Sequence, residues 1–378
     1  MNMKYKLKDI FDLQMGKTPS RNHTEYWNTK EHKWISIADL TKTGKYISET
    51  KECLSDCAID DSGIKVIPAN TVVMSFKLSI GKTAITVEDM YSNEAIMAFH
   101  DKHVAEILPE YIYYMFKYKN WDEGSNKAVM GKTLNKATLS EVEIDICSLE
   151  EQREIVKVLD KMMTVLGSRE TELSLLDDLI KARFVEMFGD PYVNPLKWKK
   201  LKIKDAVTIE PQNGLYKPQS DYVTDGTGIP ILRIDGFYDG MVTDFASLKR
   251  LKCSETERQR YLLLEDDIVI NRVNSIEYLG KCAHIKELLE DTVYESNMMR
   301  MHFDPEYYNP VYICKLLCSQ FIYDQIVNHA KKSVNQASIN QKDVLDFNIY
   351  QPPLDLQNEF ADFVHQVNKS KVVVSNIS

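Results

Sequence analysis

The sequence predicts an α/β fold made of two similar globular domains, separated by two long helices that form an antiparallel coiled coil with pseudo-two-fold symmetry. Three observations lead to this prediction: a long internal repeat, strand-like and helix-like runs in each copy, and heptad spacing of apolar residues between the copies. The chain has 378 residues, which leaves room for two such domains with cores of their own.

The internal repeat is clearest at the end of each copy. Residues 133–155 align without a gap with residues 338–360, and the matched positions include Gln152 with Gln357. Three weaker similarities precede it in the same order: residues 6–13 with 202–209, 71–85 with 267–285, and 92–99 with 296–303. A duplicated domain with loop insertions produces this pattern, and a repeat of this length rules out a solenoid of short units.

The first part of each copy alternates strand-like and helix-like runs. The strand-like runs are rich in β-branched and aromatic residues and lie at 34–40, 63–76, 229–237 and 266–273. Helices are predicted over 109–119 and 309–327, because each has proline near its first turn and apolar residues three and four apart. The globular part of each copy is therefore expected to be α/β.

The segment 149–188 predicts one long helix with a coiled-coil seam. It contains no proline, its apolar residues are spaced alternately four and three apart, and Gly189 follows it. The seam residues of the two copies are Ile155, Leu159, Met162, Leu166, Leu173, Leu176, Ile180, Phe360, Val364 and Val367. We expect the two helices to pair in antiparallel orientation. The alternative is that each helix packs on its own globular domain.

The composition is that of a folded chain without a membrane segment. Apolar residues make up 44%, and no apolar run approaches the ~20 residues that span a bilayer. The N-terminus lacks the apolar region and cleavage site of a signal peptide. The 7 cysteines are odd in number and have no framework spacing, so we expect a cytoplasmic protein. The net charge of −9 argues against a chain coated for nucleic acid over its whole surface, although local basic surfaces remain compatible with it.

A Gly-Lys-Thr triplet occurs repeatedly, beginning at Gly16, Gly81 and Gly131. The triplet is the core of the phosphate-binding P-loop, which needs another glycine five positions earlier so that the backbone curls around the phosphates. Those positions hold phenylalanine twice and asparagine once. None of the copies is therefore a nucleotide site.

The sequence contains no recognisable catalytic motif. An adenine methyltransferase needs an Asp/Asn-Pro-Pro-Tyr/Phe motif and a glycine-rich cofactor loop. The nearest segment, residues 309–312, has valine at the third position and is better explained as a helix N-cap followed by proline. The 8 histidines show no ligand spacing, and no nuclease pattern stands out. We therefore expect neither cofactor nor metal, and we expect catalysis to belong to partner proteins.

Two similar domains held apart by a rigid helix are suited to one DNA duplex. A helix of about 38 residues spans on the order of 55 Å at ~1.5 Å per residue. Because DNA rises ~3.4 Å per base pair, the two domains would address patches at most ~15 base pairs apart. Diverged copies would recognise two unlike half-sites.

Several segments together match one known family. The opening stretch has a Gly-x-Thr-Pro-Ser turn at 16–20, a Tyr-Trp pair, and a Trp-led run ending in Asp-Leu at 34–40. The other matching segments are VIPANTVVMSFKLSIGKTAI, SNEAIMAF, LEEQREIV and QPPLDLQNEF. With the duplication and the long helices, these segments resemble the specificity subunit of Type I restriction-modification systems over nearly the whole chain.

The resemblance implies two target recognition domains, each recognising one half of a split, asymmetric site in double-stranded DNA. It assigns residues 1–148 and 190–353 to these domains, 149–189 to a conserved central helix, and 354–378 to a short C-terminal conserved helix. The helices would carry two methyltransferase subunits, and a restriction and translocation subunit would join through that core. The turn at 16–20 would then face DNA phosphate with no nucleotide bound.

The residues expected to contact DNA are basic and polar side chains near this turn and near the Gly-Lys hairpins. They are Lys17, Ser20, Arg21, Asn22, Lys77, Lys82, Lys217, Arg233, Arg272, Asn274 and Lys281. For each of them, a solvated surface position is the alternative. Tyr26 and Trp27 are expected to fix the loop by packing rather than to stack on bases. The charge pair Lys331-Lys332 is interpreted as two lysines that are simply solvated at the surface.

Two other functions stay open at this point. A bifunctional enzyme would fuse the same recognition domains to methylation or cleavage, but no ~200 residues remain for a catalytic domain. A coiled-coil interaction scaffold would bind partners without DNA specificity. Duplex binding that weakens with salt separates the scaffold from a DNA-binding protein.

Overall fold

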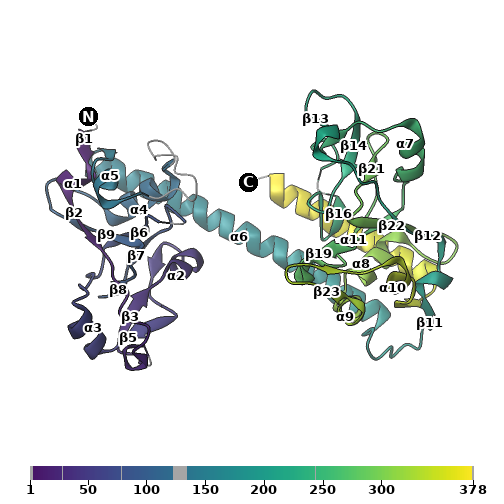
Figure 1. Ribbon diagram of the computed structural model, residues 1–378, viewed down its shortest axis with the longest axis horizontal. Helices are drawn as coiled ribbons and strands as arrows, with labels where there is room; N and C mark the ends of the chain where they lie inside the picture. Colours follow the sequence, from purple (N-terminus) through teal and green to yellow (C-terminus); the bar gives the residue numbers. More distant parts are fainter. Residues whose placement is uncertain (1–2, 28, 78, 122–133, 243, 377–378) are drawn as a thin grey trace. The chain divides into compact units, whose positions relative to one another are not determined.

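The computed structural model describes residues 3–27, 29–77, 79–121, 134–242 and 244–376 (Figure 1). The chain forms two compact units, Met1–Gly167 and Ser168–Ser378. Both units mix helices with strands, so the predicted α/β class and the duplication are confirmed. In the described part of the chain, no helix is both long and apolar enough to cross a membrane.

The first unit is built on a five-stranded sheet of order β2-β9-β6-β7-β4, antiparallel except between β7 and β4. The strands are β2 Phe11–Met15, β9 Ile96–Asp101, β6 Val72–Ser75, β7 Thr83–Thr86 and β4 Tyr46–Ile47. Helix α4, Pro109–Tyr118, buries Ile112 and Phe116 in one cluster with Phe99 of the sheet. This cluster is the main core of the unit.

Smaller elements complete the first unit. A three-stranded sheet contains β5 Glu52–Leu54, β3 His32–Ile35 and β8 Tyr91–Ser92, and a ribbon pairs β1 Met3–Lys6 with β10 Glu143–Ile146. The short helices are α1 Leu7–Ile10, η1 Thr24–Tyr26, α2 Ile37–Lys42, α3 Asp56–Ser62 and α5 Lys136–Ser140. The long helix α6, Leu149–Phe188, follows the ribbon, and its residues 149–167 belong to this unit.

The second unit repeats the plan with additions. Its ribbon pairs β11 Lys199–Lys202 with β25 Asn348–Gln351. A six-stranded sheet contains β12 Val207–Asn213, β22 Met298–Phe303, β18 Ile268–Asn271, β20 Cys282–His284, β16 Gly240–Val242 and β15 Phe237–Tyr238. Two further sheets contain β13 Tyr222–Val223, β17 Arg250–Leu251, β14 Ile229–Leu232 and β21 Val293–Tyr294, and then β19 Val273–Asn274, β24 Ala337–Ser338 and β23 Lys331–Lys332.

The helices of the second unit are interspersed with its strands along the chain, and α11 follows the last of the strands. They are η2 Ile203–Asp205, η3 Gln219–Asp221, α7 Glu255–Tyr261, η4 Ile276–Tyr278, α8 Pro310–Leu317, α9 Gln320–His329, α10 Gln341–Leu345 and α11 Leu354–Asn376. The amide oxygen of Asn309 accepts a hydrogen bond from Val311 N at 2.9 Å, with Pro310 in the first turn of α8. The predicted N-cap at this position is confirmed.

The run predicted over 63–76 is a strand only at Val72–Ser75, and the run over 229–237 is divided between β14 and β15. Two further predicted elements also differ from the structure. The strand predicted over 34–40 ends at Ile35, because Ser36 caps α2: Asp39 N donates to its hydroxyl at 3.3 Å, and Ser36 N donates to the Asp39 carboxylate at 2.8 Å. The helix predicted over 309–327 is two helices, because Ser319 has extended backbone angles between α8 and α9. The Ser36 side chain caps α2, whereas the Ser319 hydroxyl donates to Leu316 O at 2.6 Å, so in both places a serine that bonds the local backbone outweighs the apolar pattern.

A buried glutamine fixes the start of α6 in the first unit. Gln152 has no exposed surface, and its amide oxygen accepts a hydrogen bond from Leu108 N at 2.9 Å. Its amide nitrogen donates to Glu106 O at 2.8 Å and to Cys147 O at 2.9 Å. One side chain therefore satisfies three backbone groups at the junction of α4, β10 and α6.

The second unit repeats this arrangement with Gln357 at the start of α11. Its amide oxygen accepts from Asn309 N at 2.9 Å, and its amide nitrogen donates to Tyr307 O at 2.9 Å and to Pro352 O at 2.8 Å. Gln357 is likewise fully buried. The sequence match between residues 152 and 357 thus reflects the same buried hydrogen-bond network in both copies.

Replacing Gln357 with alanine should lower the free energy of unfolding of the second unit by ~3 kcal/mol or more, because one N–H and two carbonyl groups lose their partner in a buried place. Urea denaturation followed by circular dichroism measures the change. Gln366→Ala is the matched control, since Gln366 is exposed on the same helix and its loss should change the value by at most ~0.5 kcal/mol. Equal effects of the two substitutions would contradict the role given to Gln357.

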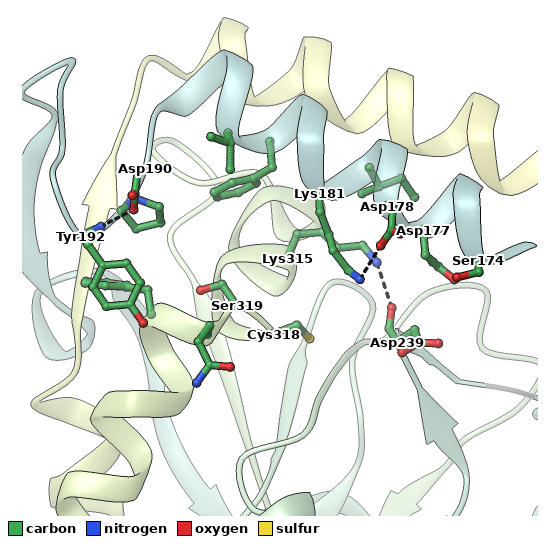
Figure 2. Close-up of a pocket in the computed structure, with 16 residues that line it drawn as sticks. Ser174, Asp177, Asp178, Lys181, Asp190, Tyr192, Asp239, Lys315, Cys318 and Ser319 are labelled. Atoms are coloured by element: carbon green, nitrogen blue, oxygen red, sulfur yellow. Dashed lines mark hydrogen bonds and ion pairs between the residues drawn. The ribbon is translucent and has the colours of Figure 1, made fainter. Parts of the chain in front are cut away.

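Within the second unit, the last turns of α6 pack against α11 in antiparallel orientation (Figure 2). Arg183 Nη2 lies 3.2 Å from Glu359 Oε1. Farther from the end of α6, the Asp177 carboxylate accepts a hydrogen bond from Lys371 Nζ. A lower residue number in α6 is thus paired with a higher one in α11, so the two helices run antiparallel.

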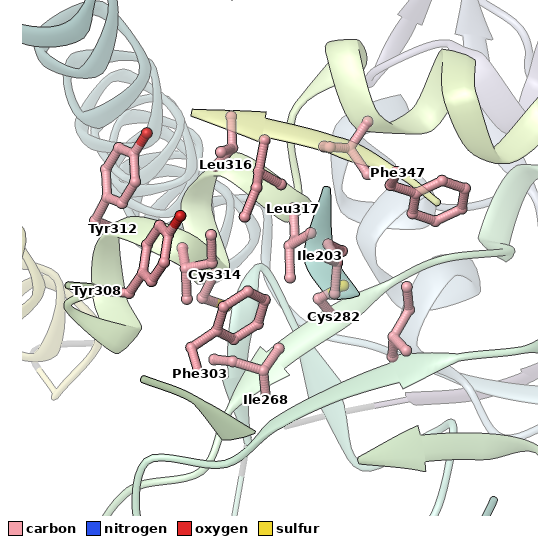
Figure 3. Packing of buried hydrophobic residues seen from close by; sticks show 14 of the residues in the cluster. Ile203, Ile268, Cys282, Phe303, Tyr308, Tyr312, Cys314, Leu316, Leu317 and Phe347 are labelled. Atoms are coloured by element: carbon pink, nitrogen blue, oxygen red, sulfur yellow. The ribbon is translucent and has the colours of Figure 1, made fainter. Parts of the chain in front are cut away.

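The apolar core of the second unit joins this helix pair to the six-stranded sheet. The ring centroid of Phe360 in α11 lies 5.5 Å from that of Phe184 and 5.4 Å from that of Phe188, both in α6. Figure 3 shows the adjoining part of the cluster, where Tyr312 of α8 and Phe303 of β22 contribute their rings. Helices and sheet thus share one core in this unit.

The predicted seam residues fall into two groups. Ile180, Phe360, Val364 and Val367 are buried in the core of the second unit, Leu176 packs against it, and Leu173 is half-buried. Leu159 packs against the core of the first unit, and Ile155, Met162 and Leu166 have exposed fractions of 39, 54 and 38%. Leu159 therefore packs on its own domain, which was the alternative to helix pairing. For Ile155, Met162 and Leu166, pairing with the other long helix stays a prediction.

Candidate nucleic-acid interface

The first unit holds the predicted Gly-x-Thr-Pro-Ser turn against the end of β8. Gly16 N donates to Ile96 O at 3.1 Å, and Lys17 N donates to Ser92 O at 2.8 Å. A Cβ atom at Gly16 would lie only 2.2 Å from Asn93 O, so the close approach requires glycine. The turn is therefore fixed by its backbone, and within the unit the Lys17 side chain donates to Ser62 O.

Two tryptophans hold the rest of this loop. Trp34 Nε1 donates to Lys17 O at 3.1 Å, and Trp27 Nε1 donates to Ser20 O at 3.1 Å. The guanidinium of Arg21 lies 3.6 Å from the ring centroid of Trp27 and makes two hydrogen bonds with Glu52, at 2.5 and 3.1 Å. Trp27 thus packs within the domain, and the planar guanidinium is pre-oriented at the surface.

Glu94 lies among the cations of this loop. The Thr18 hydroxyl donates a hydrogen bond to the Glu94 carboxylate, and this bond is the main cause that lowers the pKa of Glu94, followed by a backbone hydrogen bond and then by the charges of Lys77 and Arg21. Lys77 follows β6 and is half-buried beside the ring of Phe76. Phe76 N donates to Ala95 O at 2.9 Å, so Lys77 lies beside the segment of Glu94, and its contact with DNA stays a prediction.

The pKa of Glu94 predicts a pH dependence. A carboxyl group whose folded pKa lies below its ordinary value of 4.5 stabilises the fold fully above that value and loses this contribution as pH falls through the folded pKa. We expect Glu94→Gln to be less stable than the wild type at neutral pH, with the difference shrinking as pH falls below 4.5. Thermal midpoints measured between about pH 7 and pH 3 check this. A difference that stays constant with pH would contradict it.

Lys82 lies on the other side of the same hairpin. The hairpin turns at Gly81, which has a φ of 87°, and Ser75 N donates to Lys82 O at 2.9 Å. Lys82 lines a cavity of about 570 Å³ together with Lys117, Lys119 and Trp121, among other residues. Lys82 is exposed, and its neighbours in this cavity differ from those of Arg21. The third Gly-Lys-Thr triplet, at 131–133, lies outside the described residues.

The second unit has an equivalent loop that begins at Gly214. Gly214 N donates to Met298 O at 3.1 Å, and Leu215 N donates to Tyr294 O at 2.8 Å. A Cβ atom at Gly214 would lie 2.3 Å from Glu295 O, which repeats the close approach at the first loop. The residue after Leu215 is Tyr216, whose exposed fraction is 77%. Sequence reasoning missed Tyr216, because only the three-dimensional match of the loops shows that it takes the place of Thr18.

Arg272 and Arg233 flank this second loop. Arg272 Nη1 donates to Ser296 O at 3.0 Å, and Ser296 N donates to Leu215 O at 3.0 Å. Arg233 Nε lies 3.6 Å from the Glu295 carboxylate, in the segment that supports Gly214. Asn274 lies on β19, two residues after Arg272. The side chain of Asn274 accepts a hydrogen bond from Ser275 N at 2.8 Å. These residues therefore form one contiguous surface with the loop.

The two predicted lysines of the second unit are engaged within the domain. Lys217 contacts Glu257 at 3.0 Å and Asp221 at 3.6 Å, and the hydrogen bond that Lys217 donates to Glu257 is the main cause that raises its pKa. Lys281 Nζ lies 3.4 Å from the ring centroid of Tyr238, and burial lowers its pKa. Lys281 corresponds to Lys82, since Asn271 N donates to Lys281 O as Ser75 N does to Lys82 O, and its Nζ lies 3.5 Å from Ile234 O. Its contribution to binding stays a prediction.

A cavity of about 750 Å³ lies along α6 in the second unit, next to the junction of α8 and α9 (Figure 2). Lys181 Nζ donates to Asp178 at 3.0 Å, and Lys315 Nζ donates to Asp239 O at 2.9 Å. Both lysines of this cavity therefore already have a partner within the unit. Among the residues that the structure describes, no group of three His, Cys, Asp or Glu side chains could hold a metal ion.

Comparison with known proteins decides the family. A family model described as "Type I restriction modification DNA specificity domain" matches residues 2–173 and 195–374, which together make up most of the chain. The chain belongs to this family. The two matched segments also coincide with the internal repeat, so each unit is one copy of the specificity domain.

Curated relatives carry the same family name. The MjaIX specificity subunit of Methanocaldococcus jannaschii is 27% identical over 269 residues, covering 65% of this chain and 61% of the relative. The EcoKI specificity subunit of Escherichia coli is 26% identical over 286 residues, covering 69% of this chain and 60% of the relative. The chain thus spans about three fifths of the length of these relatives.

Solved structures share the fold of the specificity domains. The S subunit of a Type I restriction-modification system from M. genitalium matches with a TM-score of 0.52 and 14% identity, covering 100% of this chain and 91% of that chain. A chain from a structural study of type I R-M complex assembly matches with a TM-score of 0.58 and 16% identity, covering 100% and 92%. At these identities the likeness concerns the fold alone.

Proposed function

We propose that this chain is the DNA specificity subunit of a Type I restriction-modification complex and that it recognises a bipartite, asymmetric DNA site. The observation that carries the proposal is the repeated loop: each unit pins a glycine turn, at Gly16 and at Gly214, beside basic side chains. The two loops differ in the residues they present, with Thr18 in one and Tyr216 in the other. Two different loops on two similar domains suit a DNA site whose two halves differ in sequence.

The chemistry of the two surfaces fits duplex DNA. Arginine and lysine contact phosphate oxygens and position a protein on the duplex, whereas side chains that reach base edges give specificity. Arg21 and Arg272 are each oriented by partners within the domain, Glu52 and Ser296 O, before any ligand arrives. Pre-oriented guanidinium groups lose less side-chain entropy on binding.

We further propose that the long helices bind methyltransferase subunits, two in number, and that restriction subunits join through the same complex. Exposed apolar side chains of α6, such as Met162 and Val158, support a protein partner on this helix. Catalysis then belongs to the partners, and this chain acts as a non-catalytic recognition subunit in the cytoplasm. A bifunctional methyltransferase and endonuclease has no specific support among the described residues.

Duplex binding tests the DNA-binding part of this proposal against a coiled-coil scaffold. We expect the full-length chain to bind a duplex with an affinity that falls steeply with salt concentration, because phosphate contacts release counterions. The slope of log K against log salt is negative, and Arg272→Gln and Arg21→Gln should each make it shallower by roughly 0.9. Fluorescence anisotropy over a salt series measures these slopes. Binding that is absent at low salt would favour the scaffold.

A further inference from the structure

A hairpin of the second unit extends beside the candidate interface. Strands β23 and β24 pair in antiparallel register, Lys331 with Ser338 and Lys332 with Ala337, and Ser333 N donates to Gln336 O at 2.7 Å to close the turn. Residues 331–336 are all exposed, and Val334 at the tip has an exposed fraction of 96%. The tip thus presents a nearly bare apolar side chain between polar neighbours.

This hairpin carries two consecutive lysines, Lys331 and Lys332. In the part of the chain that the structure describes, neither Lys331 nor Lys332 forms an ion pair, whereas Lys217 and Lys202 of the same unit do. Consecutive residues of a strand point to opposite faces. Because Lys331 and Lys332 are nevertheless both exposed, the ribbon is open to solvent on both of its faces. Such a ribbon can approach a ligand from either side.

The hairpin is joined to the candidate interface by backbone pairing. Its second strand, β24, pairs with β19, where Asn274 lies opposite Ala337. One residue beyond β24, Ile339 N donates to Arg272 O at 3.0 Å. Arg272 in turn contacts the segment that supports the loop of Tyr216, through Ser296. The hairpin and the loop therefore adjoin the same arginine.

We propose that this hairpin is a DNA-contacting finger of the second unit, with Lys331 and Lys332 on phosphates and Val334 against base edges in the major groove. The inference rests on the proposed function and adds to it an element that sequence reasoning left as a solvated charge pair. A two-stranded ribbon fits a major groove, which is ~12 Å wide. An apolar side chain at the tip discriminates bases by contact with the thymine methyl group.

The size and charge of the hairpin favour DNA over a protein partner. A stable protein interface buries about 800 Å² on each side and has an apolar centre depleted of lysine. The hairpin offers one exposed valine among cationic and polar residues, namely Lys331, Lys332, Ser333, Asn335 and Gln336. That composition suits phosphate contacts around a single apolar base contact.

The test compares two double substitutions in the full-length chain. We expect Lys331→Gln with Lys332→Gln to reduce the slope of log K against log salt by roughly 1.8, because two phosphate contacts are lost at ~0.9 each. The matched control is Lys199→Gln with Lys200→Gln, which removes two consecutive exposed lysines from β11 and should leave the slope unchanged. Thermal midpoints of both variants that equal the wild-type value show that both remain folded.

The outcomes separate this inference from the function on which it rests. If the hairpin variant keeps the wild-type slope while Arg272→Gln reduces it, the hairpin does not contact phosphate and the finger is refuted, although the DNA-binding function stands. If the wild-type chain shows no salt-dependent binding, the proposed function itself fails. A slope reduced by the hairpin variant and unaffected by the β11 variant supports the finger.

Val334 supplies an independent arm of the test. With a methyltransferase subunit co-expressed, Val334→Ser should relax the base preference at a position in only one block of the modified motif, since the hairpin belongs to one unit. Its salt slope should equal that of the wild type, because no charge is removed. An unchanged motif would refute the base contact at the tip.

Discussion

Replacing Phe360 with alanine is expected to lower the free energy of unfolding of the second unit by ~3–5 kcal/mol. The side chain has no exposed surface and packs edge-on against the rings of Phe184 and Phe188. Its removal leaves a cavity where α6, α11 and the sheet meet, and it also removes two aromatic contacts worth ~0.5–1.5 kcal/mol each beyond their buried area. Urea denaturation of the full-length chain measures the loss.

The matched control is Phe363→Ala on the same helix. Phe363 is only half-buried, and its ring lies 5.7 Å from the Arg183 guanidinium. We expect this substitution to cost ~1 kcal/mol, because part of its surface is already in contact with water. If Phe363→Ala were as destabilising as Phe360→Ala, the shared core would not be centred on Phe360. A large effect of Phe360 alone would locate the helix pair in the cooperative core of the unit.

Gly16→Ala is expected to weaken DNA binding by about tenfold or more, since it displaces an entire loop of contacts rather than one side chain. A Cβ atom at this position would lie 2.2–2.3 Å from Asn93 O, Ser92 O and Ser92 Oγ, two of which are backbone atoms that cannot give way locally. The loop must then move away from β8, and Lys17 and Arg21 move with it. Anisotropy titration with duplex DNA at constant salt measures the effect.

Gly44→Ala is the control for this substitution. Gly44 belongs to the same unit, and a Cβ atom there would have no other atom within 4 Å. We therefore expect Gly44→Ala to bind DNA as the wild type does, with an unchanged thermal midpoint. Equal affinities of the two alanine variants would show that the anchored turn does not position the DNA contacts.

The parts of the fold that the sequence predicts correctly are those with local, periodic signals. The helix over 149–188 follows from its apolar spacing, and it ends before Gly189, which has a φ of 79°. The duplication follows from matched positions such as Gln152 and Gln357, whose identity is set by the same three backbone groups in each unit. Where a serine side chain bonds the local backbone, as at Ser36 and Ser319, the apolar pattern alone is misleading.

The candidate site is less predictable because its residues are defined by long-range contacts. The motif at 16–20 locates the first loop, yet its partners Glu52, on β5, and Glu94, in the turn between β8 and β9, have no pattern in the sequence. Basic residues are visible in a sequence, but whether a carboxylate already engages them is not. Lys217, held by Glu257, and Lys331, which has no ion pair among the described residues, look equally available until the fold is known.

The measurement that tests the central claim most directly is the mapping of modified adenines in host DNA after co-expression of this chain with the methyltransferase subunit of its own locus. Two unlike specificity domains in one chain predict a split motif, made of two short unlike blocks with a spacer of fixed length. Exchange of residues 1–148 for those of another specificity subunit should change one block and leave the other unchanged. A continuous motif, or no modification although both proteins are soluble and associated, would contradict the assignment of one half-site to each unit.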